Sequence, residues 1–365
     1  MPTIEERKNR HIRVSLEEAV ESGASTGLEE VHLIHRALPE IDLEEVDTSI
    51  RLFGRRLEAP IIISALTGGT EEGKRINEVL ATAAEEYGIG IGVGSQRIAL
   101  EDPSREPTFT IVRERAPNTL VIANLGCPQL SLGWGVEEAR RCIEMVEADA
   151  LAIHMNPLQE AVQVGGETRY RGILSRIREL TEALETPIIM KETGCGVSAE
   201  DARRIEEAGA EAIDVGGAGG TSWAIVEHHI AREVGDKERE ALGKALGDWG
   251  IPTAISIVEV SQSTGLRVIA SGGIRTGLDI AKAIALGADA VGIARPFLHR
   301  AVEGLDSVRS YILELVRELR TVMFLVGARD VEELRRTPIV ITGKTAEWLR
   351  MRGFNPESYA RRGGR

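Results

Sequence analysis

Short apolar runs rich in β-branched residues recur along the chain, each followed by glycine or polar residues and then by a segment with helical periodicity. Continuous apolar runs are typical of parallel strands that are covered on both faces. The pattern predicts eight strands, at residues 61–66, 89–93, 120–124, 150–154, 188–191, 212–215, 268–271 and 290–293. Helices are expected between them, among others at 71–87, 136–146, 172–184, 199–208 and 277–286.

The approach to three of these strands is repeated, as Glu147-Ala-Asp-Ala150, Ala208-Gly-Ala-Glu-Ala212 and Leu286-Gly-Ala-Asp-Ala290. Such a repeat favours one closed array over two unrelated domains. The fold class is therefore α/β, a (β/α)8 TIM barrel, and a barrel of about 250 residues leaves room for extensions in a chain of 365 residues. We expect a single domain over 1–365, with a barrel core at 61–300.

Three further segments are expected outside the barrel core. Residues 1–60 form an N-terminal extension, with a helix that starts at the capping box Ser15-Leu-Glu-Glu18 and a hairpin around Phe53-Gly-Arg-Arg56. The charged stretch 227–249, between strands six and seven, is interpreted as a mobile insertion or lid. Residues 301–365 supply closing helices, the first of them from residue 307, and a basic tail that is expected to fray.

The charge balance is acidic, with 44 Lys and Arg against 57 Asp and Glu and a formal net charge of −13. This balance excludes a general nucleic-acid or anionic-membrane binder, which needs a broad basic field. The three cysteines lack CxxC spacing, the first residues are charged, and no apolar run is long enough to span a bilayer. We therefore expect a cytoplasmic protein.

Reactive groups of such barrels lie at the carboxyl ends of the strands. The last two strands end in Ser271-Gly-Gly-Ile-Arg275 and Gly292-Ile-Ala-Arg295, which predict a phosphate site, although a lone Gly-Gly could be a tight turn. Lys191 ends an apolar strand and needs an anionic neighbour there, unless it reaches solvent or pairs with Glu192. Together with Asn124, Thr67 and Ser95, these groups indicate a planar cofactor.

Over essentially its whole length the chain resembles the type 2 isopentenyl diphosphate isomerases, which are flavin mononucleotide (FMN) enzymes. The motifs that carry the resemblance are Arg7-Lys-Asn-Arg-His11, Leu66-Thr-Gly-Gly69, Gly94-Ser-Gln-Arg97, His154-Met-Asn-Pro-Leu-Gln-Glu160 and Gly219-Gly-Thr-Ser-Trp223. The Ser271-Gly-Gly-Ile-Arg275 element is shared with flavin-dependent hydroxy-acid oxidases. The chain departs from the pattern at Ala65-Leu66, where the family often has Met before Thr-Gly-Gly.

The resemblance implies a set of site residues. It assigns the flavin to Ala65, Leu66, Thr67, Ser95, Asn124, Lys191, Thr221, Gly273, Ile274, Arg275, Ala294 and Arg295. It assigns the substrate diphosphate to Arg7, Lys8, His11, Ser95, Gln96, Arg97, His154, Asn156 and Gln159. It further implies a Mg²⁺ ligand at Glu160, catalytic roles for Lys191, His154 and Gln159, NADPH as reductant, and a homotetramer or homooctamer.

The residues themselves leave alternatives open. The basic cluster Arg7 to Arg13 suits an anionic substrate but is also typical of a solvated tail. Asn156-Pro-Leu-Gln159 has the order of a helix start, so that Gln159 and Glu160 could be capping residues as well as ligands. His154 could be an acid or base, or could bind a phosphate, which is the reading we favour.

The implied reaction interconverts isopentenyl and dimethylallyl diphosphate, a step of isoprenoid biosynthesis that adds a proton at one carbon and removes one at another, without net redox change. Our hypothesis makes the reduced flavin the acid and base, with Lys191 stabilising its anionic ring and NAD(P)H serving only to reduce it. A hydroxy-acid oxidase is the rival, but 218–223 lack a His base. The remaining alternative is a non-catalytic flavin-binding protein.

Overall fold

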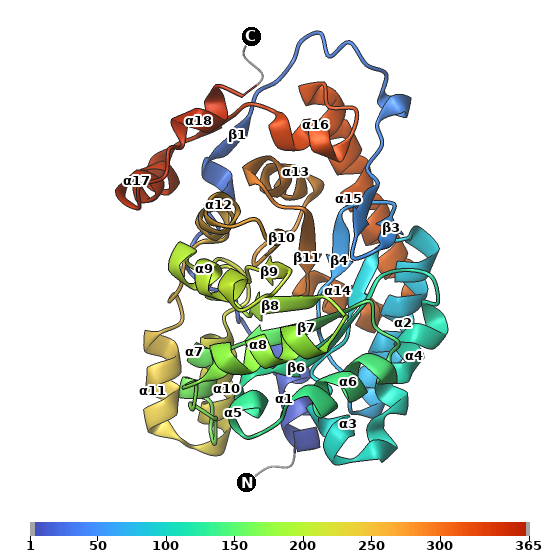
Figure 1. Cartoon of the computed structure of the whole chain (residues 1–365), viewed down its shortest axis with the longest axis vertical. Coiled ribbons are helices and arrows are strands. Elements are labelled where there is room, and N and C mark those ends of the chain that lie inside the picture. The colour runs from blue at the N-terminus through green and yellow to red at the C-terminus, as the bar shows by residue number, and fades with distance from the viewer. Residues whose placement is uncertain (1–3, 363–365) are drawn as a thin grey trace.

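A closed parallel barrel of eight strands forms the centre of the molecule, in the computed structural model, which describes residues 4–362 (Figure 1). Each strand pairs with the next along the chain and the last, β11, pairs with β4. This confirms the predicted (β/α)8 barrel. The strands are β4 Ile61–Ile63, β5 Gly90–Gly92, β6 Val121–Gly126, β7 Ala150–Met155, β8 Ile188–Glu192, β9 Ala212–Asp214, β10 Arg267–Ser271 and β11 Ala290–Ile293.

The outer layer consists of helices that cover the strands, as Figure 1 shows. Side-chain caps fix several of their starts: Thr70 accepts from Gly73, Ser198 from Asp201 and Thr276 from Asp279. Two helices have the predicted bounds and the others differ by one or two residues. The layer contains α2 Glu71–Tyr87, α4 Pro107–Arg115, α6 Val136–Met145, α8 Ile173–Ala183, α9 Ala199–Glu207, α12 Thr253–Ser263, α13 Gly277–Leu286 and α15 Leu305–Val326.

A β-hairpin, β2 Ile50–Leu52 and β3 Arg55–Leu57, closes the amino-terminal end of the barrel. Its buried Leu52 and Leu57 pack among inward-facing strand residues such as Ile62 and Ile122. The turn lies at Phe53-Gly54, where the sequence predicted it. Because the hairpin closes the amino-terminal end, a cavity can form only at the carboxyl end of the barrel.

The N-terminal extension differs from the expectation in one respect. Its helix α1 spans Ile4–Glu17, so Ser15 lies in the last turn and does not start a helix. The Ser15 carbonyl instead accepts a hydrogen bond from the Arg295 side chain at 2.8 Å. Apolar contacts of Ile12 and Val14, which are buried, stabilise the helix further upstream than the capping pattern indicated.

The charged stretch after strand β9 is helical, which the lid interpretation did not anticipate. It contains the end of α10, Trp223–Val234, and all of α11, Lys237–Ala245, and both pack against α7, Pro157–Val162. The smaller elements are η1 Leu28–Glu30, β1 Val31–Leu33, η2 Leu43–Glu45, α3 Arg97–Glu101, η3 Pro103–Arg105, α5 Cys127–Ser131, α14 Arg295–Glu303, α16 Val331–Arg336, β12 Ile339–Ile341, α17 Gly343–Met351 and α18 Glu357–Ala360.

Strand β12 was not predicted; it pairs with β1, so that Val31 lies opposite Ile341. The pairing joins a segment that precedes the barrel strands to one that follows them. The expected basic tail begins at Arg361, and its last three residues lie outside the described part of the chain.

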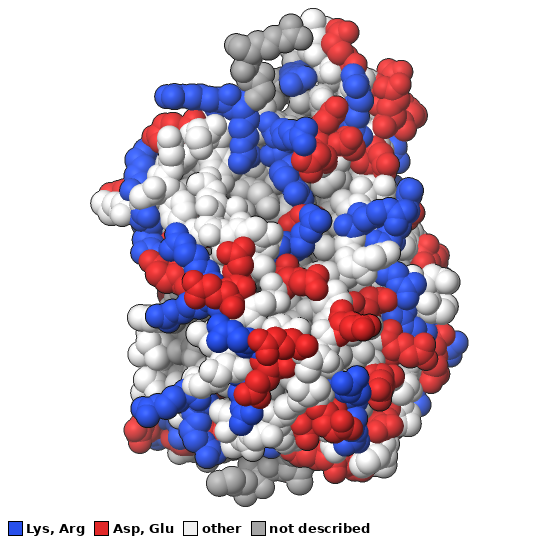
Figure 2. Space-filling view, viewed as in Figure 1, with Lys and Arg blue, Asp and Glu red and all other residues white. Residues whose placement is uncertain are grey.

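Acidic and basic side chains are interspersed over the face seen in Figure 2, and this face carries no continuous basic area among the described residues. Within residues 4–362, no helix is both long and apolar enough to cross a membrane.

Candidate functional site

A cavity of about 290 Å³ opens at the carboxyl ends of the barrel strands. It is lined by residues from all of the motifs that the sequence singled out. Of the predicted site residues, the structure brings together Arg7, Lys8, His11, Ala65, Leu66, Thr67, Ser95, Arg97, Asn124, His154, Asn156, Gln159, Glu160, Lys191, Thr221, Gly273, Ile274, Arg275, Ala294 and Arg295.

Gln96 is the predicted site residue that does not line this cavity. Its fully buried side chain donates to the Cys142 carbonyl at 2.9 Å, and its Oε1 accepts from the Asn124 backbone N–H at 2.8 Å. The structure thus places Gln96 behind the cavity wall, where it supports the backbone of strand β6.

One end of the cavity is built to receive an anion. Helix α14 starts there after Ala294 without a side-chain cap, so its first N–H groups have no side-chain acceptor. Gly273 has a φ of +74°, and a Cβ added there would lie 2.3 Å from Thr26 Cγ2. Gly272 is equally crowded, with an added Cβ 2.1 Å from the Gly217 carbonyl oxygen. Only glycine allows the backbone to approach this closely.

Arg275 and Arg295 flank the anion end and share the carboxylate of Glu21. Nη2 of Arg275 lies 3.0 Å from Glu21 Oε1, and Nη1 of Arg295 lies 2.6 Å from the same oxygen. Arg295 also donates from Nε to the Ser15 carbonyl, at the carboxyl end of α1. A cation at this helix end is favourable, so Arg295 connects the anion end of the cavity to the helix that carries Arg7 and Lys8.

Lys191 has the anionic neighbour that its position demanded, and it is not Glu192. Its Nζ lies 2.8 Å from Oδ2 of Asp214, on the adjacent strand β9. Sequence reasoning missed Asp214, although its place near the end of an apolar strand was the available signal. The Ser271 hydroxyl donates to the other carboxylate oxygen of Asp214.

The opposite end of the cavity contains Lys8 of helix α1. Its ammonium group donates to the carbonyls of Gly68 at 2.8 Å and Ser95 at 2.9 Å, and it lies over the Phe109 ring. Loss of hydration on burial lowers the pKa of Lys8 to about 7, and the nearby Arg7 charge adds to this effect. An anionic ligand at this position would favour the charged lysine.

His154, near the end of strand β7, lies between the two ends of the cavity. Its Nδ1 lies 2.8 Å from Oδ1 of Asn124. Burial lowers the pKa of His154 to about 4, and the charges of Lys191 and Lys8 lower it further. The imidazole is therefore neutral at physiological pH unless a bound anion compensates for the two lysines.

A hydrogen-bonded group joins Gln159 to helix α1. Glu227, at 1% side-chain exposure, accepts from Gln159 Nε2 at 3.2 Å and lies 2.8 Å from His11 Nε2. The His11 ring packs edge to face on Trp223. Sequence reasoning missed Glu227 because it lies in the charged stretch 227–249, whose residues were expected to face solvent.

Glu160 lies at the start of α7 with both carboxylate oxygens engaged. Oε1 accepts from Asn156 at 3.1 Å, and Oε2 accepts from the Glu167 backbone N–H at 2.7 Å. Within residues 4–362, no three His, Cys, Asp or Glu side chains are grouped so that they could hold a metal ion. Glu160 could therefore hold Mg²⁺ only together with oxygens of a ligand and water, which is a common arrangement for this ion.

The cavity fits a flavin mononucleotide. The anion end suits its phosphate, and the polar rim formed by Thr67, Asn124 and Lys191 suits the hydrogen-bonding edge of its ring. Ser64 Oγ, on the cavity wall, is buried without a hydrogen-bond partner, which leaves it available to a ligand. The three cysteines are free thiols, and Cys127 and Cys142 are buried.

Comparison with known proteins identifies the family of the chain and proteins with a similar fold. Residues 138–341 match the family described as FMN-dependent dehydrogenase. The chain is 49% identical to the isopentenyl-diphosphate delta-isomerase of Methanosarcina barkeri, with 98% of each chain covered, and 48% identical to that of Pyrococcus furiosus, with 95% of this chain and 89% of the relative covered. A solved structure of mandelate oxidase with (S)-2-phenylpropionate superposes with a TM-score of 0.61 at 22% identity, covering 92% of this chain and 98% of that one; this likeness concerns the fold alone.

Proposed function

Because the chain belongs to the FMN-dependent dehydrogenase family and, within it, to the isopentenyl-diphosphate delta-isomerases, we propose that it interconverts isopentenyl and dimethylallyl diphosphate in isoprenoid biosynthesis. The observation that carries the proposal is the single cavity in which an anion end, Lys191 and the α1 cations meet. The reaction moves a double bond without net redox change. It needs an acid and a base close to the substrate carbons and a cation cluster for the diphosphate.

When bound and reduced, FMN would supply the acid and base groups of the reaction, and NADPH would serve only to reduce it. The anion end would hold its phosphate through Gly273, Ile274, Arg275, Ala294 and Arg295. The ring would contact Ala65, Leu66, Thr67, Ser95, Asn124, Lys191 and Thr221. Lys191 would stabilise negative charge on the pyrimidine side of the ring.

The α1 end of the cavity would bind the diphosphate of the substrate. Its ligands would be Arg7, Lys8, His11, Ser95, Arg97, His154, Asn156 and Gln159, while Gln96 acts from behind the wall by fixing strand β6. His154 would bind a phosphate oxygen, because an anion there would offset the charges of Lys8 and Lys191, which add to the effect of burial in lowering its pKa. Gln159, held by Glu227, would lie over the reacting part of the substrate.

Glu160 would hold Mg²⁺ together with oxygens of the diphosphate and water. The exchange Glu160→Gln removes the carboxylate charge but keeps the shape. We expect the Mg²⁺ concentration for half-maximal activity to rise about tenfold or more, as ligand losses at metal sites do. Glu167→Gln is the matched control, since the carboxylate of Glu167 binds Arg169 instead. Equal Mg²⁺ dependence in wild type and Glu160→Gln would contradict the assignment.

The activity itself is tested by anaerobic incubation of the protein with isopentenyl diphosphate, FMN and Mg²⁺, with and without NADPH or dithionite. Turnover only with reductant supports the proposal. Flavin binding without isomerisation under any condition contradicts it. Oxidation of 2-hydroxy acids is the second assay, because the Ser271-Gly-Gly-Ile-Arg275 element makes a hydroxy-acid oxidase the rival function, although 218–223 provide no His base in this chain.

A homotetramer or homooctamer in the cytoplasm completes the proposal. The free thiols fit a reducing compartment. Size-exclusion chromatography with light scattering measures the assembly directly.

A further inference from the structure

Asp214 is held in the barrel interior by neighbours on two other strands. The strand register places it beside Lys191 of β8 and Ile269 of β10. Its Oδ2 lies 2.8 Å from Lys191 Nζ, and its Oδ1 accepts from the Ser271 hydroxyl. The Ser271 oxygen in turn accepts from the Gly216 backbone N–H at 3.1 Å. Both carboxylate oxygens therefore have fixed partners.

The ion pair lies in a poorly hydrated part of the site. The side chains of Lys191 and Asp214 are 13% and 7% exposed. Below the main cavity is a small one of about 20 Å³, lined by Ser64, Asn124 and both members of the pair among others. Its size is close to the smallest that holds one water molecule. Charges act strongly in such surroundings, because little water screens them.

We propose that Asp214 is a positioning residue that fixes Lys191 and offsets part of its charge, and so sets the reduction potential of the bound flavin. The inference rests on the proposed function insofar as it places the flavin ring next to Lys191. A bare ammonium group at the ring would draw electron density from it and favour its reduction. With Asp214 paired to Lys191, the ring keeps more electron density, which a proton-accepting cofactor requires.

Glu192 cannot take the place of Asp214, although it follows Lys191 directly. Its Oε2 accepts three backbone N–H groups, from Thr193 at 2.6 Å, Gly194 at 2.6 Å and Cys195 at 2.5 Å. Lys191 approaches only the Glu192 carbonyl, at 3.4 Å. Asp214 is thus the carboxylate that the structure pairs with Lys191.

Substitution of Ser271 provides a second, independent way to change the charge of Asp214. Its hydroxyl donates to Asp214 and so withdraws charge from the carboxylate. Removal of the hydroxyl in Ser271→Ala concentrates negative charge on the oxygens that face Lys191. The exchange Asp214→Asn keeps the shape and an acceptor oxygen but removes the charge. The two variants should therefore shift the flavin potential in opposite directions.

The experiment measures the reduction potential of FMN bound to the holoenzyme, by anaerobic dye equilibration followed in the visible spectrum. We expect a higher potential in Asp214→Asn, a lower one in Ser271→Ala, and a value near wild type in Asp214→Glu. We expect kcat for isomerisation to fall roughly tenfold in Asp214→Asn with KM unchanged, since the hydrogen bond from Lys191 then goes to a neutral acceptor instead of a charged one.

An unchanged potential in both Asp214→Asn and Ser271→Ala would overturn the proposal. If Asp214→Asn does not fold or bind FMN, Ser271→Ala decides: a lowered potential supports the proposal and an unchanged one overturns it. The potential is measured without substrate. A wild-type protein that binds FMN but does not isomerise would refute the proposed function and leave this measurement valid.

Discussion

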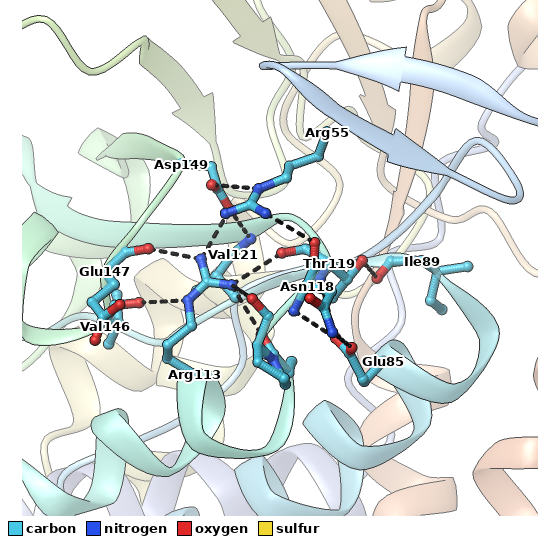
Figure 3. A network of polar contacts seen from close by, with 12 residues as sticks. Arg55, Glu85, Ile89, Arg113, Asn118, Thr119, Val121, Val146, Glu147 and Asp149 are labelled. Atoms are coloured by element: carbon cyan, nitrogen blue, oxygen red, sulfur yellow. Dashed lines mark hydrogen bonds and ion pairs between the residues drawn. The ribbon is translucent and has the colours of Figure 1, made fainter.

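The two ends of the barrel use the same residue types for different purposes. At the amino-terminal end, Arg113 donates to Asp149 at 2.9 Å and to several backbone carbonyls, and Arg55 of the hairpin binds the other oxygen of Asp149 at 2.8 Å (Figure 3). At the carboxyl end, Lys8 and Lys191 lie on the wall of an open cavity. The charges at the amino-terminal end contact only the protein, whereas Lys8 and Lys191 have protein partners and also face a cavity that a ligand can enter.

The amino-terminal, closed end of the barrel is also where the repeated approach to the strands lies. Asp149 and Asp289 stand at equivalent places of the repeated approach to a strand, and each accepts the backbone N–H at the start of the preceding strand, Val121 at 2.9 Å and Val268 at 2.8 Å. The repeated aspartate thus makes the same hydrogen bond, from a strand N–H to its carboxylate, at both places. At the open end most strands contribute side chains of different kinds, among them Asn124, His154 and Lys191.

The largest effect is expected at the open end. Lys191→Ala should lower turnover by roughly a thousandfold, the upper range for loss of a group that stabilises developing charge, while the protein still binds FMN. The measurement is kcat under reducing conditions.

The same exchange leaves Asp214 buried without its partner, which also costs stability. The double variant Lys191→Met with Asp214→Asn is the matched control, since it leaves no unpaired charge. It should regain stability in urea unfolding without regaining activity. Full activity in Lys191→Ala would contradict the role of this lysine.

At the closed end the effect should fall on stability alone. Asp149→Ala leaves Arg113 and Arg55 without their carboxylate partner and the Val121 N–H without its side-chain acceptor, and we expect the free energy of unfolding to fall by roughly 3 kcal/mol. Urea unfolding measures the loss, and kcat of the folded fraction should stay at the wild-type value.

Glu179→Ala is the surface control for Asp149→Ala, since the Glu179 side chain is 53% exposed beside Arg176. It should cost less than about 1 kcal/mol. A reduced kcat in folded Asp149→Ala would contradict the assignment of stability to the amino-terminal end and activity to the carboxyl end.

A smaller effect concerns pH. With the pKa of Lys8 lowered from 10.5 to about 7, the lysine of the free protein loses its proton as the pH rises through 7. A bound diphosphate favours the charged form, so affinity for the substrate should weaken above pH 7 by up to tenfold per pH unit. Titration calorimetry from pH 6 to about 9 should show this slope in wild type and its absence in Lys8→Met. A slope retained in Lys8→Met would assign the proton to another group.

The smallest effect is expected for Ser64→Ala. Since Ser64 Oγ has no hydrogen-bond partner within residues 4–362, the free energy of unfolding should change by less than about 1 kcal/mol. FMN affinity should fall about fivefold, the value of one neutral hydrogen bond. Flavin fluorescence titration measures it, and unchanged affinity would show that this hydroxyl does not contact the cofactor.

The sequence predicted the barrel well because its signals are local. Continuous apolar runs mark the strands, and α2 and α13, which Thr70 and Thr276 cap, have the predicted bounds. The predicted cavity residues came together because strand ends of one barrel converge. Whether they bind the assigned ligands is the subject of the experiments above.

What the sequence could not supply depends on distant contacts. Helix α1 is fixed by Arg295, far along the chain, whereas Ser15 offered only a local pattern that turned out to be at the wrong end of the helix. Gln96 lies within a motif, yet its side chain turns away to Cys142. The partners of Asp214 and Glu227 lie on neighbouring strands and helices, so their roles could not be predicted without the fold.

The pairing of β1 with β12 sets the order in which the protein can be completed on the ribosome. Val31 is made early, and its partner Ile341 follows roughly 15 to 60 s later at a translation rate of about 5–20 residues per second. Arg295, which binds the end of α1, is also made late. Helix α1 and strand β1 are therefore translated well before the residues that fix them, and a nascent chain has its barrel strands before its cavity is complete.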